Sequence, residues 1–152
     1  MKKRTMALLV CDQAEPIRVL EESLKCRSLK LRRANNCAEA TRALARVNPP
    51  HLVFTWANLP DGTWTDVLGI AARAKQPVNV IVVSRVVDTK LYVEVMENGA
   101  FDFIVPPVQS GDLDHIVRCA TDNVLLRREA LVPKHGQRTL GQALLARGVP
   151  TA

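Results

Sequence analysis

The sequence predicts an α/β fold in which five parallel strands alternate with five helices. Short apolar runs recur along the chain, apolar residues between them fall at helical spacing, and Pro, Gly and Asn gather at the boundaries. Strictly alternating strands and helices require crossover connections, which place helices on both faces of a parallel sheet. A chain of 152 residues suits one domain with a substantial core and is short for two.

The first third of the chain predicts two strand–helix units. Residues 7–10 form an apolar run typical of a central buried strand, and Pro16 is expected to open a helix because its fixed φ suits a first turn. Residues 29–34 alternate apolar and charged residues, as in a strand near a sheet edge. Asn35 and Asn36 can cap the second helix. Its apolar stripe comprises Ala40, Ala43, Leu44 and Val47.

The middle of the chain predicts a short buried strand over residues 51–56, followed by a turn over residues 58–62. In open α/β sheets, ligand and catalytic sites lie at the carboxyl ends of such strands. This strand ends in Trp56, whose indole offers one hydrogen-bond donor and no nucleophile. The third helix is expected to start near Trp64 and to end near residue 75.

The remaining elements are predicted from the same kinds of signal. Residues 78–83 are β-branched and apolar on both faces, as in a buried parallel strand. Asp88 or Thr89 caps the next helix, which ends at Asn98 and Gly99. Residues 101–105 form the fifth strand, and residues 111–128 the last helix. Its predicted inward residues are Leu113, Ile116, Val117, Ala120, Val124 and Leu125.

Two regions follow from this pattern, a domain over residues 1–131 and a tail over residues 132–152. The tail carries a weak amphipathic stripe, so a short docked helix and a frayed end are both open readings. The longest apolar runs cover only four or five residues, and Cys11 and Asp12 interrupt the first one. We therefore expect a cytoplasmic protein without a membrane span.

Charge and cysteine content predict no specialised binding. The net charge of +6 lacks a dense basic block, which favours a solvated basic face. Four cysteines show no CxxC pair, so free and mostly buried thiols are expected. The three histidines form no triad with a Ser or Cys, and we expect them on the surface.

Four stretches together resemble the receiver domain of bacterial response regulators. They cover residues 8–12, 50–62, 80–84 and 99–107, and the likeness extends over residues 5–128. It implies a flavodoxin-like doubly wound sheet with strand order 2-1-3-4-5. The run over residues 91–105 and the helix after it are most similar to receivers that precede ATPase-type transcription activators.

The resemblance also implies a phosphorylation site, which this sequence has largely lost. The phosphoacceptor aspartate is replaced by Trp56, and the acidic pair that helps to hold Mg²⁺ is reduced to Cys11 and Asp12. Pro106 stands where the family has a lysine, so the cation that would pair with a phosphoryl oxygen is missing. The Ser/Thr switch position remains as Ser84, and the aromatic switch position remains as Phe103.

This set predicts weak or lost Mg²⁺ binding and no cofactor, because Mg²⁺ requires six oxygen ligands. Asp12 and the backbone carbonyl of Asn58 would be only a remnant of the metal site. We expect the Trp56 N–H to donate to a buried acceptor, either Asp12 or the Ser84 hydroxyl. Pro107 is a candidate for the cis-proline that the family places after the fifth strand.

Three functions compete at this point. The first is a pseudo-receiver that acts by protein contacts, including a homodimer through residues 88–98, 101–105 and 111–128. The second is a phosphorelay receiver whose acceptor is Asp12 or Asp61. The third is an adaptor that binds nucleic acid through its basic tail, which we rank last because no recognition-helix motif is present. No glycine-rich phosphate loop or nucleophile elbow supports an enzyme.

Overall fold

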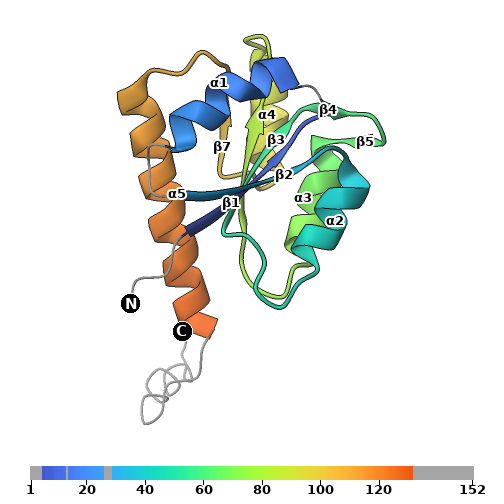
Figure 1. Ribbon diagram of the computed structural model, residues 1–152, viewed down its shortest axis with the longest axis vertical. Helices are drawn as coiled ribbons and strands as arrows, with labels where there is room; N and C mark the ends of the chain where they lie inside the picture. The colour runs from blue at the N-terminus through green and yellow to red at the C-terminus, as the bar shows by residue number, and fades with distance from the viewer. Residues whose placement is uncertain (1–4, 13, 26–28, 132–152) are drawn as a thin grey trace.

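The computed structural model describes residues 5–12, 14–25 and 29–131 and contains a five-stranded parallel sheet (Figure 1). In chain order its strands are β1 (Thr5–Val10), β2 (Leu29–Ala34), β3 (Leu52–Trp56), β6 (Asn79–Val83) and β7 (Asp102–Ile104). They lie side by side in the order β2-β1-β3-β6-β7. Numbered along the chain, this is the order 2-1-3-4-5, and the predicted fold class is confirmed.

Five helices cover the two faces of this sheet. Helices α1 (Ala14–Lys25) and α5 (Ser110–Leu131) pack on one face, and α2 (Cys37–Leu44), α3 (Trp64–Ala72) and α4 (Thr89–Glu97) pack on the other. Figure 1 shows α5 running along the sheet on the side opposite α2 and α3. Each face buries its own hydrophobic core.

Strand β3 lies at the centre of the sheet and all five of its residues are buried. Side chains alternate across a strand, so neighbouring residues of β3 serve different cores. Phe54 and Trp56 belong to the core under α1 and α5, while Val53 belongs to the core under α2, α3 and α4. The last residue of β3 pairs in register with Val83 of β6.

The predicted turn after β3 forms a small hairpin rather than an unstructured loop. Strands β4 (Asn58–Leu59) and β5 (Gly62–Thr63) pair in antiparallel register, with Pro60 and Asp61 at the tip. The sequence signals of Pro, Asp and Gly were sufficient for a turn, but two residues per strand are too few to produce a strand pattern.

Helix ends follow the predicted capping chemistry. Asn36 accepts a hydrogen bond from the backbone of Glu39, and Asp88 accepts one from Leu91. At the end of α4, Gly99 has a φ of 97°, a left-handed conformation that a residue without Cβ adopts readily. The helix starts of α2 and α4 and the end of α4 are therefore confirmed.

Some predicted boundaries and inward residues are wrong. Helix α1 begins at Ala14, so Pro16 lies within its first turn rather than opening it. Helix α2 ends at Leu44, which leaves Val47 outside the helix and 67% exposed. Leu125 of α5 is 44% exposed because it lies about 100° around the helix from the fully buried Val124, outside the stripe that faces the sheet. Helical spacing locates an apolar stripe but not its exact width or the residue at which the helix ends.

Arg128 attaches the carboxyl end of α5 to the edge of the sheet where β3 and β6 begin. Its guanidinium donates hydrogen bonds to the backbone carbonyls of Pro49, Pro50 and Pro77, at 3.0, 2.8 and 2.8 Å. These prolines precede β3 and β6 and leave carbonyls outside the sheet ladder. Partial burial lowers the pKa of Arg128, while the three carbonyls supply the acceptors that a desolvated cation needs.

A second contact at this edge involves the buried side chain of Asn79, at the start of β6. Its amide donates to the Ala120 carbonyl at 2.8 Å and to Asn123 at 3.0 Å, and its oxygen accepts from Arg127 at 2.7 Å. Both sets of bonds hold the last turns of α5 against the strand starts. No helix in the described part of the chain has the length and apolarity to span a bilayer. The tail over residues 132–152 lies outside the described residues.

We expect Arg128→Ala to lower the free energy of unfolding by about 2–3 kcal/mol, because it leaves three carbonyls without their charged donor. Urea denaturation followed by circular dichroism measures this change. Arg118→Ala is the matched control, since Arg118 is exposed on the same helix. An equal decrease in the free energy of unfolding of the two variants would show that the contacts with the three carbonyls do not stabilise the fold.

Candidate functional site

A pocket of about 530 Å³ lies at the carboxyl ends of β3 and β6. It is lined by Asp12, by residues 56–60 and 83–86, and by Asp88 and Leu91 of the α4 start. The sheet positions these groups because parallel strands end at the same edge, where loops from β1, β3 and β6 meet. The structure therefore brings Trp56, Asp12 and Ser84 together, as the sequence predicts.

Trp56 closes one wall of this pocket and belongs to the core. Its side chain is only 7% exposed and packs with Leu9, Cys11 and Ile104 in the core under α1 and α5. Among the described residues, none accepts a hydrogen bond from its Nε1, although that atom is buried. The predicted bond to Asp12 or Ser84 is therefore wrong: the ring follows the inward direction of β3 rather than turning its N–H to the polar loops.

The remaining acidic position does not form a paired site. Cys11 is fully buried in the core, whereas Asp12 is exposed at the pocket rim. The backbone N–H of Cys11 donates to the Ala34 carbonyl at 2.9 Å, which extends the pairing of β1 with β2. A thiol directed into the core contributes no oxygen ligand, so this corner of the pocket offers one carboxylate from the β1 loop.

Ser84 is 94% buried and its hydroxyl is used within its own loop. It donates to the Val86 carbonyl at 2.9 Å and accepts from the Val86 N–H at 3.3 Å. The backbone N–H of Ser84 bonds to the Ile104 carbonyl at 3.0 Å, which links the loop to β7. The hydroxyl thus stabilises the β6–α4 loop in this conformation.

Phe103 is half-buried on β7 and contacts α4. Its ring meets the Tyr92 ring edge-to-face, with centroids 5.8 Å apart and planes at 78°. Such aromatic pairs stabilise by roughly 0.5–1.5 kcal/mol beyond burial. This contact ties the aromatic position of β7 to α4, and the sequence did not reveal it because Tyr92 and Phe103 belong to different elements.

The Pro106–Pro107 peptide bond is cis, which confirms the expectation for Pro107. Pro106 stands where the resemblance places a lysine, and it is absent from the lining of the pocket. No group of three or more His, Cys, Asp or Glu side chains in the described ranges is placed to hold a metal ion. Arg85 is the cation in the pocket wall.

Comparison with known proteins assigns the chain to a family. No protein-family model matches the sequence. Over 142 residues it is 36% identical to the response regulator protein PilR of Pseudomonas aeruginosa, covering 92% of this chain and 31% of that protein. The chain therefore spans about a third of that relative's length. This chain is a response-regulator receiver domain.

Solved structures agree with this assignment at the level of the fold. The signal receiver domain of a putative Luxo repressor protein from Vibrio parahaemolyticus superposes with a TM-score of 0.76 at 22% identity, covering 86% of this chain and all of that chain. NtrX from Brucella abortus superposes with a TM-score of 0.73 at 22% identity, covering 93% of this chain and 33% of that chain. The similarity to PilR agrees with the predicted likeness to receivers of ATPase-type activators.

In this receiver, Asp61 caps helix α2 from the tip of the β4–β5 hairpin. Its carboxylate accepts hydrogen bonds from the backbone N–H groups of Cys37 at 2.7 Å and Ala38 at 3.1 Å. Because the bond from Cys37 stabilises the charged form, the pKa of Asp61 is lowered. The two residues are 24 positions apart in sequence, so local patterns did not indicate this role.

Gly62 and the Cys37 thiol lie close together beside this cap. A Cβ on Gly62 would lie 2.5 Å from the Asp66 carboxylate and 2.8 Å from Cys37 Sγ, so no larger residue fits without displacement. Burial, followed by the nearby Asp61 charge, raises the pKa of Cys37 to about 11. Cys11 is also buried, whereas Cys119 is exposed. The expectation of mostly buried thiols is confirmed for the described cysteines.

The expectation that His51 is solvated is corrected, because its Nδ1 accepts from the Met6 N–H at 3.0 Å and ties β1 to the chain entering β3. Trp64 packs on the core under α2, α3 and α4 and does not line the pocket. The described residues hold 14 of the 21 Lys and Arg residues and all 15 acidic residues, a formal net charge of −1, so the excess positive charge of the sequence lies outside them.

We expect the contribution of Asp61 to the free energy of unfolding to depend on pH. Its folded-state pKa lies below the ordinary value of 3.8, so the native state binds its proton less readily than the unfolded state. The contribution is present above the unfolded pKa and is lost as pH falls through the folded pKa. Asp61→Asn should therefore weaken folding at pH 7 and reduce the loss between pH 5 and 2.

Urea midpoints of both proteins across this pH range measure the effect. Asp122→Asn is the control, because Asp122 is exposed on α5 far from the α2 start. A parallel pH dependence of wild type and Asp61→Asn would contradict the capping role.

Proposed function

We propose that this chain is a pseudo-receiver, which takes part in two-component signal transduction through protein contacts and without aspartyl phosphorylation. One observation carries the proposal: the position of the phosphoacceptor holds the buried indole of Trp56. Phosphoryl transfer to a receiver requires a carboxylate oxygen that attacks phosphorus and a metal ion that neutralises the developing charge. An indole provides neither function.

The surroundings of Trp56 support the same proposal. The acidic corner retains Asp12 and has lost its second carboxylate to the buried Cys11. Asp88, the other carboxylate in the pocket wall, already caps α4 through the Leu91 N–H at 3.1 Å. Mg²⁺ prefers near-octahedral oxygen ligation, so we propose that its binding here is weak or lost and that the domain uses no cofactor.

Phosphorylation of another aspartate is the competing proposal. Asp61 is disfavoured because each of its two oxygens accepts an N–H of the α2 start, and an acyl phosphate would turn one of these oxygens into the bridging atom of a mixed anhydride and disrupt its hydrogen bond. Asp12 is exposed and borders the pocket, so it is the stronger of the two alternatives. Among the described residues, it belongs to no group of three or more potential metal ligands.

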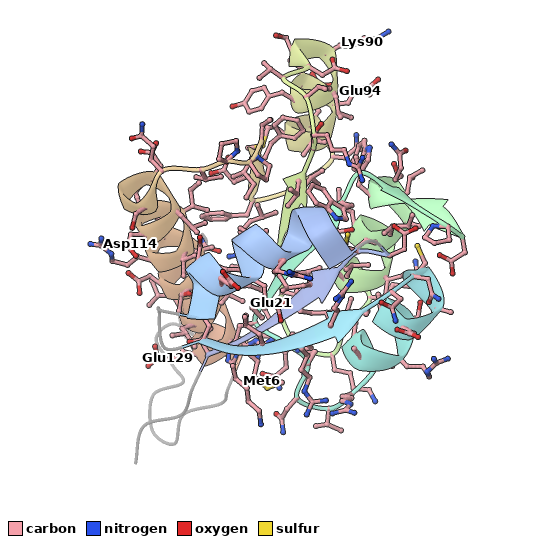
Figure 2. The ribbon with its side chains drawn as sticks, turned by 45° about the horizontal axis from the view of Figure 1, so that its top comes forward. Met6, Glu21, Lys90, Glu94, Asp114 and Glu129 are labelled. Atoms are coloured by element: carbon pink, nitrogen blue, oxygen red, sulfur yellow. The ribbon has the colours of Figure 1, made fainter. Side chains whose placement is uncertain are left out.

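The proposed working surface comprises α4, β7 and α5, through which we infer homodimer formation or binding of a signalling partner. Tyr92 and Val93 of α4 are 44% and 43% exposed, and Leu126 of α5 is 66% exposed. Figure 2 shows the side chains of Lys90 and Glu94 projecting from α4 and that of Asp114 projecting from α5. Exposed apolar groups bordered by charges are typical of protein interfaces.

A nucleic-acid adaptor finds less support in the described domain, whose formal charge is −1. The excess cations lie in residues 1–4, 27 and 132–152 of the sequence. Any electrostatic attraction to phosphates would have to come from those segments. We therefore keep protein contact, not nucleic-acid binding or catalysis, as the proposed function.

We expect that Mg²⁺ with acetyl phosphate adds no phosphoryl group to the chain. We also expect that Mg²⁺ with beryllofluoride does not change its tryptophan fluorescence. Intact mass spectrometry tests for an added phosphoryl group, and fluorescence of Trp56 and Trp64 tests for binding. An orthodox receiver treated in parallel controls for reagent activity. A saturable, Mg²⁺-dependent fluorescence change with added phosphoryl mass would refute the pseudo-receiver proposal. Asp12→Asn and Asp61→Asn would then locate the acceptor.

Restoring the missing groups should restore metal binding. The variant Cys11→Asp, Trp56→Asp, Pro106→Lys is expected to bind Mg²⁺, measured by calorimetry and by an increase in its thermal unfolding temperature with Mg²⁺. The variant Cys11→Asp, Pro106→Lys retains Trp56 and is expected to show neither effect. Removal of the indole costs about 3–5 kcal/mol, so folding is checked by circular dichroism. A folded triple variant without Mg²⁺ affinity would contradict the alignment of these positions.

A further inference from the structure

Near its carboxyl end, α5 carries two exposed leucines between two exposed carboxylates. Leu125 and Leu126 are 44% and 66% exposed, and each lies three or four residues from both Asp122 and Glu129. Side chains at these spacings are neighbours on a helix surface. The four groups therefore form one patch on the side of the helix away from the buried Val124, and we call them the α5 outer patch.

The sequence that follows α5 contains the signals of a second, short helix. Thr139 and Gln142 match a capping box, in which a Ser or Thr and a Glu or Gln three residues later bond the first N–H groups of a helix. Gly148 stands where helices commonly end, and Pro150 follows two residues later. These signals predict a helix over residues 139–147.

This predicted helix has one apolar face and a basic surrounding sequence. Leu140, Ala143 and Leu144 fall at the i, i+3 and i+4 spacing of one helix face. Residues 132–152 contain no acidic residue and three cations, Lys134, Arg138 and Arg147. A helix of nine residues is marginal in water unless its apolar face packs against another surface. An apolar surface bordered by carboxylates complements both the face and the charge of this segment.

The connection between α5 and this segment has a length that allows the chain to turn back. Residues 132–138 lie between the end of α5 at Leu131 and the predicted cap. Connections of about two to eight residues commonly join antiparallel helices. Pro133 and Gly136 disfavour continuation of α5 through this connection. The sequence therefore favours a reversal of the chain rather than one long helix.

An antiparallel return brings complementary groups together. Each helical residue advances about 1.5 Å, so a helix over residues 139–147 covers the last nine residues of α5. Arg147, at the far end of the segment, then lies beside the helical turn that holds Asp122. Leu144, one turn earlier, lies beside the two exposed leucines of the outer patch.

We propose that residues 139–147 fold back as a helix and dock on the α5 outer patch, with Leu144 against the leucines and Arg147 beside Asp122. The docked segment covers Leu126, which belongs to the surface proposed for protein contacts. A partner that contacts Leu126 must displace the segment, so its apparent affinity falls in proportion to the fraction of chains with an uncovered patch. This consequence rests on the proposed working surface, whereas the docking itself does not.

Amide hydrogen–deuterium exchange of the full chain, followed by mass spectrometry, tests the docking. We expect residues 139–147 to exchange about tenfold or more slowly than the same sequence in a free peptide, because their amides form helical hydrogen bonds only while the segment is docked. Light scattering should give the mass of a monomer. The protection should not change on dilution, since both surfaces belong to one chain.

Substitutions in the segment and in the patch test the contact itself. Leu144→Ser should reduce the protection to that of the free peptide, whereas Leu145→Ser, the same change about 100° around the helix, should retain it. Asp122→Lys and Arg147→Asp should each reduce the protection about two- to fivefold, as expected for an exposed ion pair, and the double variant should recover it. Circular dichroism checks that each variant is folded.

Three results would overturn docking on the patch: unprotected amides over residues 139–147 in the wild type, protection that survives Leu144→Ser, or equal losses in Leu144→Ser and Leu145→Ser. Failure of the double variant to recover protection would overturn the pairing of Arg147 with Asp122. Protection that falls on dilution of a species with doubled mass would place the segment on a second copy and overturn contact within the chain. The phosphodonor experiment is independent of these results, so the docking and the proposed function can fail separately.

Discussion

The packing of the Trp56 indole at the end of β3 constrains everything at the carboxyl edge of the sheet. Because β3 is central, its side chains are committed to the two cores, and a residue at its last position can either turn toward the loops or pack inward. The indole packs inward with Leu9 and Cys11. Burial of a side chain this large stabilises the fold by about 2–3 kcal/mol, whereas a carboxylate in the same place would require a metal or hydrogen bonds.

The pocket beside the indole has a polar border, but two of its polar groups are already bonded within the protein. The loops still enclose about 530 Å³, and Asp12, Ser84 and Asp88 still border it. Yet Ser84 bonds within its loop and Asp88 caps α4. These polar groups therefore stabilise the observed conformation of the β6–α4 loop and the start of α4. The ring contact between Phe103 and Tyr92 links β7 to α4, which belongs to the surface proposed for protein contacts.

Helix α5 provides the other fixed element of that surface. Its inner residues fill the core, and Arg128 binds three proline carbonyls at the edge of the sheet where β3 and β6 begin. The helix is thereby held at both ends of its packed length, so residues on its outer side have defined positions.

The sequence by itself determined the strand–helix alternation, the caps at Asn36 and Asp88, and the presence of an indole at the end of β3. These depend on local periodicity, local capping geometry or the chemistry of a single side chain. Only the tertiary structure decided that the Trp56 N–H has no partner among the described residues, that Asp61 caps α2 and that Arg128 binds Pro49, Pro50 and Pro77. Such contacts join residues 24 to 79 positions apart, and a pattern confined to one element carries no information about which distant group the fold brings beside it.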